Sequence, residues 1–172
     1  MIDFAKEGPR YVIWEMTKKT NQNGLFSRQS KDTGGKDMSI NEAVRFIDSV
    51  ARAYRTTLIF SGGEPLMVPE VFDLAEFAKS KGLKVILNTN GVYVDNDAVQ
   101  RCVEAKIKGV QIGLDGSSER AHDNFRQIPG SFHECIQAID LLKLSGVKFE
   151  VYTLLQKVMP VKFPKLLHWL KS

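Results

Sequence analysis

The strongest constraint on the fold of this chain is the regular alternation of short apolar runs with longer amphipathic stretches. Strands that alternate with helices indicate β-α-β crossover units, and such units build a parallel sheet. The expected strands span residues 11–17, 57–61, 84–89, 109–115 and 149–153. The sequence therefore predicts an α/β fold with five strand–helix units.

The helices between these strands carry their own boundary signals. Ser39, with Glu42 three residues later, forms a capping box, and the apolar residues that follow recur at helical spacing. Further amphipathic helices are expected over residues 71–80, 97–106, 132–145 and 163–171. Gly82 and Gly146 stand where a helix ends in the left-handed conformation before the next strand.

Composition favours a single domain over residues 1–172. The chain has 172 residues, of which 43% are hydrophobic and 26% charged, enough for one hydrophobic core. No apolar run approaches the roughly 20 residues of a membrane span, and charged residues interrupt the start of the chain. A cytoplasmic protein is expected. The net charge of +4 is spread without a basic helix face, so neither nucleic acid nor a membrane is an expected partner.

The chain has two cysteines, Cys102 and Cys135. Both fall on the apolar faces of predicted helices and lie far apart in the sequence. Buried free thiols are therefore favoured over a disulfide or a pair of metal ligands.

Polar residues gather where the predicted strands end. Thr17, residues 61–65, residues 88–91, Asp115-Gly116 and Thr153 each follow an apolar run. Each segment alone is consistent with a turn. The carboxyl ends of parallel strands lie on one side of a sheet, so all five are expected to converge on one face. That face is the predicted site. The long polar segment 18–37 joins the first strand to the first helix, and loops of this length in a compact domain are usually functional or mobile.

Glu64 has two interpretations. Beside Gly62 and Gly63, whose backbone a ligand can approach closely, its carboxylate suits an ammonium or hydroxyl group. It also suits the first turn of a helix, where the helix dipole favours a carboxylate.

Six ordered motifs resemble the radical S-adenosylmethionine superfamily, in particular the branch that matures peptides and modifies haem precursors. They are the segments 14–17 (WEMT), 60–66 (FSGGEPL), 87–91 (LNTNG), 113–116 (GLDG), 122–126 (HDNFR) and 130–132 (GSF). Their order and spacing agree with that family from about residue 11 to the end of the sequence.

The resemblance implies a partial parallel barrel whose first loop carries Cys-x3-Cys-x2-Cys. In the family these thiolates hold a 4Fe–4S cluster, which reductively cleaves S-adenosylmethionine to a 5′-deoxyadenosyl radical that modifies a peptide or haem precursor. The matching positions here are Thr20, Gly24 and Ser27. Glycine has no ligand atom, and hydroxyl groups are poor substitutes for the soft thiolates that iron–sulfur clusters require. A cluster, and therefore catalysis, is not expected of this chain.

The resemblance also implies cofactor-binding positions for S-adenosylmethionine. Residues at the strand ends match the family's segments that contact its amino group, ribose and carboxylate. They are Ser61, Gly62, Gly63, Glu64, Asn88, Asn90, Asp115 and Arg126. Without a cluster to chelate the ligand, binding is expected to be weak.

Two departures from the family pattern carry further expectations. The last barrel unit and the auxiliary domain are absent from the sequence, so the strand at 149–153 is expected to form an open edge through which the chain self-associates. Gln127 stands where a glycine often follows the arginine.

Three hypotheses for function follow. The first is an inactive radical S-adenosylmethionine domain that has lost its cluster ligands. The second is a cluster-free binding protein for an adenosyl ligand or a peptide. The third is a cluster-independent barrel enzyme that uses Glu64, Asp115, His122 or Lys157 as an acid, base or Schiff-base group.

Overall fold

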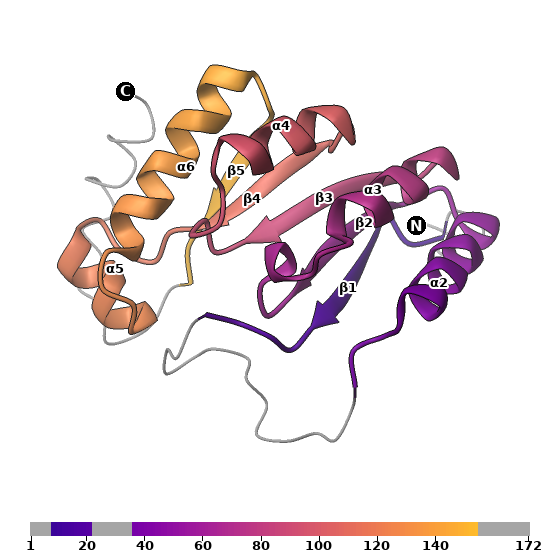
Figure 1. Cartoon of the computed structure of the whole chain (residues 1–172), viewed down its shortest axis with the longest axis horizontal. Coiled ribbons are helices and arrows are strands. Elements are labelled where there is room, and N and C mark those ends of the chain that lie inside the picture. The colour runs from indigo at the N-terminus through magenta and orange to yellow at the C-terminus, as the bar shows by residue number, and fades with distance from the viewer. Residues whose placement is uncertain (1–7, 22–35, 155–172) are drawn as a thin grey trace, which may run out of the picture.

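The computed structural model describes residues 8–21 and 36–154, which form one five-stranded sheet with helices packed against it (Figure 1). The strands follow the order β1-β2-β3-β4-β5 and every neighbouring pair is parallel. Their bounds are Tyr11–Thr17 (β1), Thr57–Gly62 (β2), Lys84–Thr89 (β3), Gly109–Gly113 (β4) and Phe149–Tyr152 (β5). Sequential parallel order in one sheet is the arrangement of a partial barrel, and the predicted fold class is confirmed.

Helices connect each strand to the next. They are α2 (Ile40–Ala53), α3 (Val71–Ser80), α4 (Asn96–Glu104), α5 (Glu119–Arg126) and α6 (Ser131–Ser145), with a short 3-10 helix, η1 (Pro65–Met67), after β2. The capping box at Ser39 is present, since its side chain accepts from the Glu42 N–H and Glu42 bonds back to the cap. Gly82 and Gly146 adopt φ of +86° and +73°, as predicted for helix ends.

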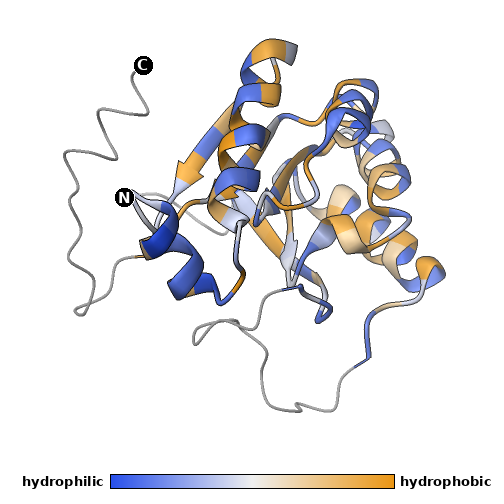
Figure 2. Cartoon of the chain, turned by 60° about the vertical axis from the view of Figure 1, so that its left-hand side comes forward, coloured by the Kyte–Doolittle hydropathy of each residue, from blue (hydrophilic) through white to orange (hydrophobic). Residues whose placement is uncertain are grey.

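The core lies on the side of the sheet that the helices cover. Alternate strand residues such as Trp14, Phe60, Leu87 and Ile112 are buried there. Because strand side chains alternate between faces, one face takes the apolar set of every strand. Figure 2 shows hydrophobic and hydrophilic residues alternating around the helices, as expected when one side of each helix packs on the sheet.

The opposite face of the sheet is more open. Tyr11 and Ile13 on β1 are 57% and 64% exposed, while their neighbour Trp14 is buried. This open face corresponds to the inside of a barrel, and its carboxyl edge holds the predicted site.

Two elements were not predicted. The helix α5 carries only His122 and Arg126 as buried residues, so it lacks the apolar periodicity that reveals a helix. The 3-10 helix η1 has three residues and starts at Pro65. The helix expected over 163–171 lies outside the described residues. No helix in the described part of the chain is both long enough and apolar enough to cross a membrane.

Candidate functional site

The polar segments predicted at the strand ends lie along one edge of the sheet. We call this the polar edge: Thr17, residues 61–64, residues 88–91 and Asp115. It follows from the parallel order, because every strand ends on the same side. The expected convergence is confirmed for these four segments, and the fifth, Thr153, lies beside them, because its Oγ1 donates to Leu114 O at 2.8 Å.

Gly62 and Gly63 allow the chain that leaves β1 to approach closely. A side chain on Gly62, whose φ is +113°, would lie 2.6 Å from the Thr17 carbonyl oxygen, and one on Gly63 would collide with the Lys19 carbonyl group. The Gly63 N–H donates to Thr17 O (2.7 Å) and the Glu64 N–H donates to Lys19 O (2.8 Å). The two glycines therefore fix the first residues after β1 against the end of β2.

Glu64 is fully buried and its carboxylate has three donors inside the protein. Thr89 Oγ1 donates to Oε1 at 2.8 Å, the Leu66 N–H donates to Oε1 at 3.0 Å, and the Asn90 N–H donates to Oε2 at 2.8 Å. Burial raises the pKa of Glu64, and these hydrogen bonds oppose that rise. Glu64 caps η1 and ties the end of β2 to the end of β3, which agrees with the helix-start interpretation.

Asn90 is also buried, and both ends of its amide are used. Its Nδ2 donates to Asn21 Oδ1 (2.6 Å), and its Oδ1 accepts from the Val92 N–H (3.0 Å). The second bond is an Asx turn after β3. The first bond holds Asn21, in the segment after β1, over the end of β3.

Asp115 and Arg126 form a buried ion pair. Arg126 Nε donates to Asp115 Oδ2 at 2.6 Å, and the two side chains are 9% and 3% exposed. Asp115 Oδ1 accepts a further bond from the Leu154 N–H at 2.8 Å. The Arg126 guanidinium fills the space that a side chain on Gly113 would need. The structure thus brings the two predicted residues together and pairs them with each other.

His122 is buried beside this pair. Its Nδ1 accepts from the Asp115 backbone N–H at 3.0 Å, so Nε2 carries the proton and lies 3.7 Å from Cys135 Sγ. Burial and the nearby Arg126 charge lower the pKa of His122 to about 4. The ring is therefore neutral at pH 7 and serves as a hydrogen-bond acceptor.

Asp123 and Gln127 have structural roles in the segment that begins at His122. Asp123 accepts from the Gly130 N–H, Ser131 Oγ and the Phe132 N–H, so it caps the start of α6. Gln127 has φ of +57° at the end of α5. A left-handed residue at a helix end favours glycine, which is the physical reason for the family glycine at this position.

Asp37 was not predicted as a site residue, yet it closes the segment that follows β1. Its carboxylate accepts from Thr17 Oγ1 (2.6 Å) and from the Lys18 N–H (3.0 Å). The start and end of the segment 18–37 are therefore held together at β1. Thr20 lies in the described part, whereas Gly24 and Ser27 lie outside the described residues.

Both cysteines are free and buried, as predicted. Cys135 Sγ donates to Asn90 O at 3.0 Å. Burial raises the pKa of each thiol to about 12, so neither is a thiolate at pH 7. Within residues 8–21 and 36–154, no three His, Cys, Asp or Glu side chains gather to hold a metal ion.

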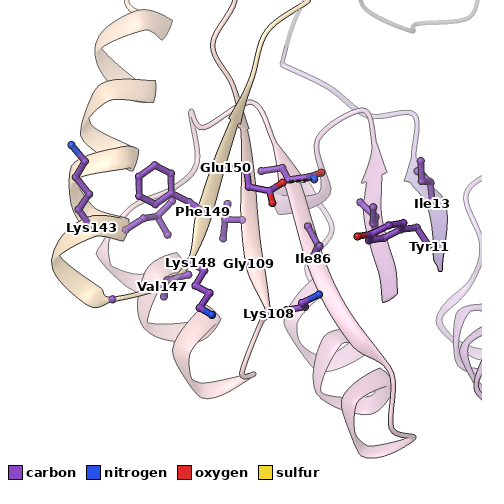
Figure 3. Close-up of a pocket in the computed structure, with 15 residues that line it drawn as sticks. Tyr11, Ile13, Ile86, Lys108, Gly109, Lys143, Val147, Lys148, Phe149 and Glu150 are labelled. Carbon is purple, nitrogen blue, oxygen red and sulfur yellow. Dashed lines mark hydrogen bonds between the residues drawn. The ribbon is translucent and has the colours of Figure 1, made fainter. Parts of the chain in front are cut away.

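The open face of the sheet contains a hollow of about 730 Å³ (Figure 3). Its floor is apolar and includes Ile13, Ile59 and Ile86, while Gln111 and Glu150 form part of its polar lining. A dashed line in Figure 3 marks the hydrogen bond between these two side chains, 3.1 Å from Gln111 Nε2 to Glu150 Oε2. Tyr11, Gly109 and Phe149, the first residues of β1, β4 and β5, line the hollow, and no residue of the polar edge does.

We predict that the neutral state of His122 makes stability depend on pH. The unfolded chain takes up this proton near its ordinary pKa of 6.5, and the folded protein only near 4. The free energy of unfolding should therefore fall as pH drops from 7 to 4, by up to about 3 kcal/mol for this group. Urea denaturation of the wild type and His122→Asn across this range measures the effect.

The difference between the two proteins isolates His122, because Glu64, whose raised pKa gives a slope of opposite sign, is common to both. If the free energy of unfolding fell by the same amount in both proteins between pH 7 and pH 4, the His122 imidazole would not be held neutral in the folded protein.

Sequence comparison identifies the family. The radical SAM superfamily matches residues 17–170. An AdoMet-dependent heme synthase of Methanosarcina barkeri is 34% identical over 151 residues, which cover 87% of this chain and 43% of that protein. The mycofactocin maturase MftC of Mycobacterium ulcerans is 28% identical over 148 residues, covering 84% of this chain and 39% of the maturase. This chain spans less than half the length of these relatives.

Solved structures agree in fold. SuiB of Streptococcus suis bound to S-adenosylmethionine has a TM-score of 0.77 at 11% identity, covering 95% of this chain and 37% of SuiB. The structure of anSMEcpe with bound AdoMet and a peptide has a TM-score of 0.69 at 20% identity, covering 82% of this chain and 42% of that one. At such identities the likeness concerns the fold alone. Fold, ordered motifs and sequence match together show that this chain belongs to the radical SAM superfamily.

Proposed function

We propose that this chain is a cluster-free radical SAM domain that binds an adenosyl ligand weakly at its polar edge. The observation that carries the proposal is the number and state of its cysteines. The sequence contains two cysteines, both lie in helices, and both thiols are buried and protonated at pH 7. A 4Fe–4S cluster of this family needs three thiolates in one loop, and this donor set does not fit it.

The ligand-binding part of the proposal depends on the buried residues that hold the polar edge in place, which we call its frame. Glu64, Asn90, Asp115 and Arg126 are buried and bonded inside the protein, so we assign them to holding the strand ends in place. Residues 61–63 and Asn88 remain partly accessible. In this proposal they contact the ligand.

Adenosyl-radical modification of peptides or haem precursors is not part of this proposed function, because the thiol donor set does not fit the cluster that would generate the radical. The cluster-independent enzyme gains no support either. Glu64, Asp115 and His122 are each already engaged by neighbouring groups, and Lys157 lies outside the described residues. Cytoplasmic localisation and self-association through β5 stay predictions.

Titration calorimetry with S-adenosylmethionine tests the binding proposal. We expect a Kd on the order of 1 mM, about −4 kcal/mol, because chelation to iron is missing. Glu64→Ala and Arg126→Ala should weaken binding at least about fivefold at a temperature where circular dichroism shows them folded, since each loosens the frame. Glu76→Ala and Arg52→Ala, on exposed helix positions, are the controls. Submicromolar binding, or unchanged affinity in both frame variants, would count against the proposal.

A further inference from the structure

Three isoleucines form an apolar row across the open face of the sheet, toward the amino ends of the strands. Ile13, Ile59 and Ile86 are register partners on β1, β2 and β3, and all three line the hollow on this face (Figure 3). Ile59 and Ile86 are 8% and 9% exposed, whereas Ile13 at the edge of the sheet is 64% exposed. We call these three residues the isoleucine row.

The apolar surface that the row presents is narrow. Residues two apart in a strand share a face of the sheet. The neighbours of Ile59 and Ile86 on this face are polar: Thr57, Ser61, Lys84 and Asn88. On β2 and β3 the apolar band is therefore one side chain wide, and it runs across the strands. A single elongated apolar chain matches such a band better than a broad ring system does.

The row leads to a glycine and then to two lysines. Ile86 is the register partner of Gly109 on β4, and the missing side chain leaves the backbone of β4 open to the hollow. Lys108 and Lys148, immediately before β4 and β5, line the hollow beyond this glycine (Figure 3). Both lysines are exposed, and no carboxylate of residues 8–21 and 36–154 forms a salt bridge with either.

The hollow thus has an apolar end and a cationic end. Lys143 of α6 joins Lys108 and Lys148 in the lining at the β4–β5 end, and Glu150 is the one carboxylate among the described lining residues. Its Oε2 accepts from Gln111 Nε2 at 3.1 Å. Three lysines against one carboxylate leave this end positive. The volume of about 730 Å³ lies within the range of about 300–1,000 Å³ that small-molecule sites have.

We propose that this hollow binds an amphipathic anion with one elongated apolar chain. The chain lies along the isoleucine row, and the anionic head group lies at Lys108 and Lys148. Burial of the chain supplies the affinity, and the two lysines select the sign of the head group. The site lies at the amino ends of the strands and shares no residue with the polar edge. The inference therefore goes beyond the proposed function and does not depend on it.

NMR titration of the full chain with three probes, each below its micelle-forming concentration, tests this site. Decanoate has the long chain and the anionic head, butyrate has the same head on a short chain, and decyltrimethylammonium has the long chain with a cationic head. Decanoate should bind at least about tenfold more tightly than either of the others. The amide signals of residues 13, 59, 86 and 109 should shift more than those of the polar edge.

Two variants separate the head group from the chain. The double variant Lys108→Glu, Lys148→Glu should weaken decanoate binding at least about tenfold and strengthen the binding of decyltrimethylammonium, because it reverses the charge at the head group. Ile13→Ser should weaken both of these probes about fivefold, because it shortens the apolar row without a change of charge. All three side chains are exposed, so both variants should fold.

Matched controls place the same changes elsewhere. The double variant Arg45→Glu, Lys79→Glu alters the net charge by the same amount at exposed positions of α2 and α3. Ile40→Ser removes another exposed isoleucine, at the start of α2. Both controls should bind decanoate as the wild type does.

Decyl phosphate, tested beside decanoate, shows which anionic head group the lysines prefer. If the wild type binds neither of these two anions, another occupant fills the hollow and the inference is wrong. It is equally wrong if decanoate binds no more tightly than butyrate. Wild-type affinity for decanoate in the Lys108→Glu, Lys148→Glu protein, or an equal loss in its control, would also overturn it.

Discussion

Arg126→Ala should lower the free energy of unfolding by about 3–5 kcal/mol, the loss expected when one partner of a buried ion pair is removed. The Arg126 side chain is 9% exposed, and its Nε lies 2.6 Å from Asp115 Oδ2. Burial raises the pKa of Glu64, and the charge of Arg126 is one of the influences that oppose this rise. Removing Arg126 would leave the buried Asp115 carboxylate without its cation. Urea denaturation measures the change.

A matched control comes from the surface of α2. Arg52 pairs with Asp48 at 2.6 Å, but its side chain is 81% exposed. Arg52→Ala should therefore cost less than about 1 kcal/mol. The double variant Asp115→Asn, Arg126→Met should be more stable than the sum of its single changes predicts, because it removes both buried charges. If the Arg126→Ala protein were as stable as the Arg52→Ala protein, this would contradict a large loss of stability on breaking the buried Arg126–Asp115 pair.

We expect the triple variant Thr20→Cys, Gly24→Cys, Ser27→Cys to gain the cluster that, in our proposal, the wild type does not hold. The Lys19 and Asn21 contacts hold the start of this segment at the ends of β2 and β3, so a thiolate at position 20 would stand at the polar edge. Three thiolates then supply the soft ligands that a 4Fe–4S cluster requires. After anaerobic reconstitution we expect a brown protein with about four irons per chain.

Variants with any two of these cysteines should stay colourless. A second control, Ser49→Cys, Ser80→Cys, Ser145→Cys, adds three thiols at separate helix positions and tests for adventitious iron. If the triple variant is folded by circular dichroism yet takes up no cluster, then positions 20, 24 and 27 are not the cluster positions of this chain.

Much of the fold could be predicted because local signals agreed with it. The bounds of β1 and α3 match the prediction, and the capping box at Ser39 and the glycine at 82 mark real helix ends. The helix α5 was not predicted because the side chains that it buries are polar. His122 and Arg126 face the end of β4, and no apolar spacing reveals a helix whose buried residues bond to a backbone N–H and a carboxylate.

The place of the site was predictable, but the partners of its side chains were not. Parallel strands put Glu64, Asn88, Asn90 and Asp115 on one edge. Whether such a residue faces a ligand or the protein depends on contacts between elements distant in sequence, such as Arg126 with Asp115. The hydrogen bonds that join Asn88, Gln111 and Glu150 across the sheet had one usable signal in the sequence: Gln111 and Glu150 interrupt otherwise apolar strands. Their alignment with Asn88 depends on register, which the sequence did not specify.

Iron content after anaerobic reconstitution of the wild-type chain tests the central claim most directly. The chain is incubated with iron, sulfide and reductant, desalted, and its iron, sulfide and visible absorption are measured. Our account predicts a colourless protein with far less than one iron per chain, since the two thiols are buried in helices and protonated. A brown protein with about four irons per chain would show that this domain holds its cluster through ligands that we have not identified.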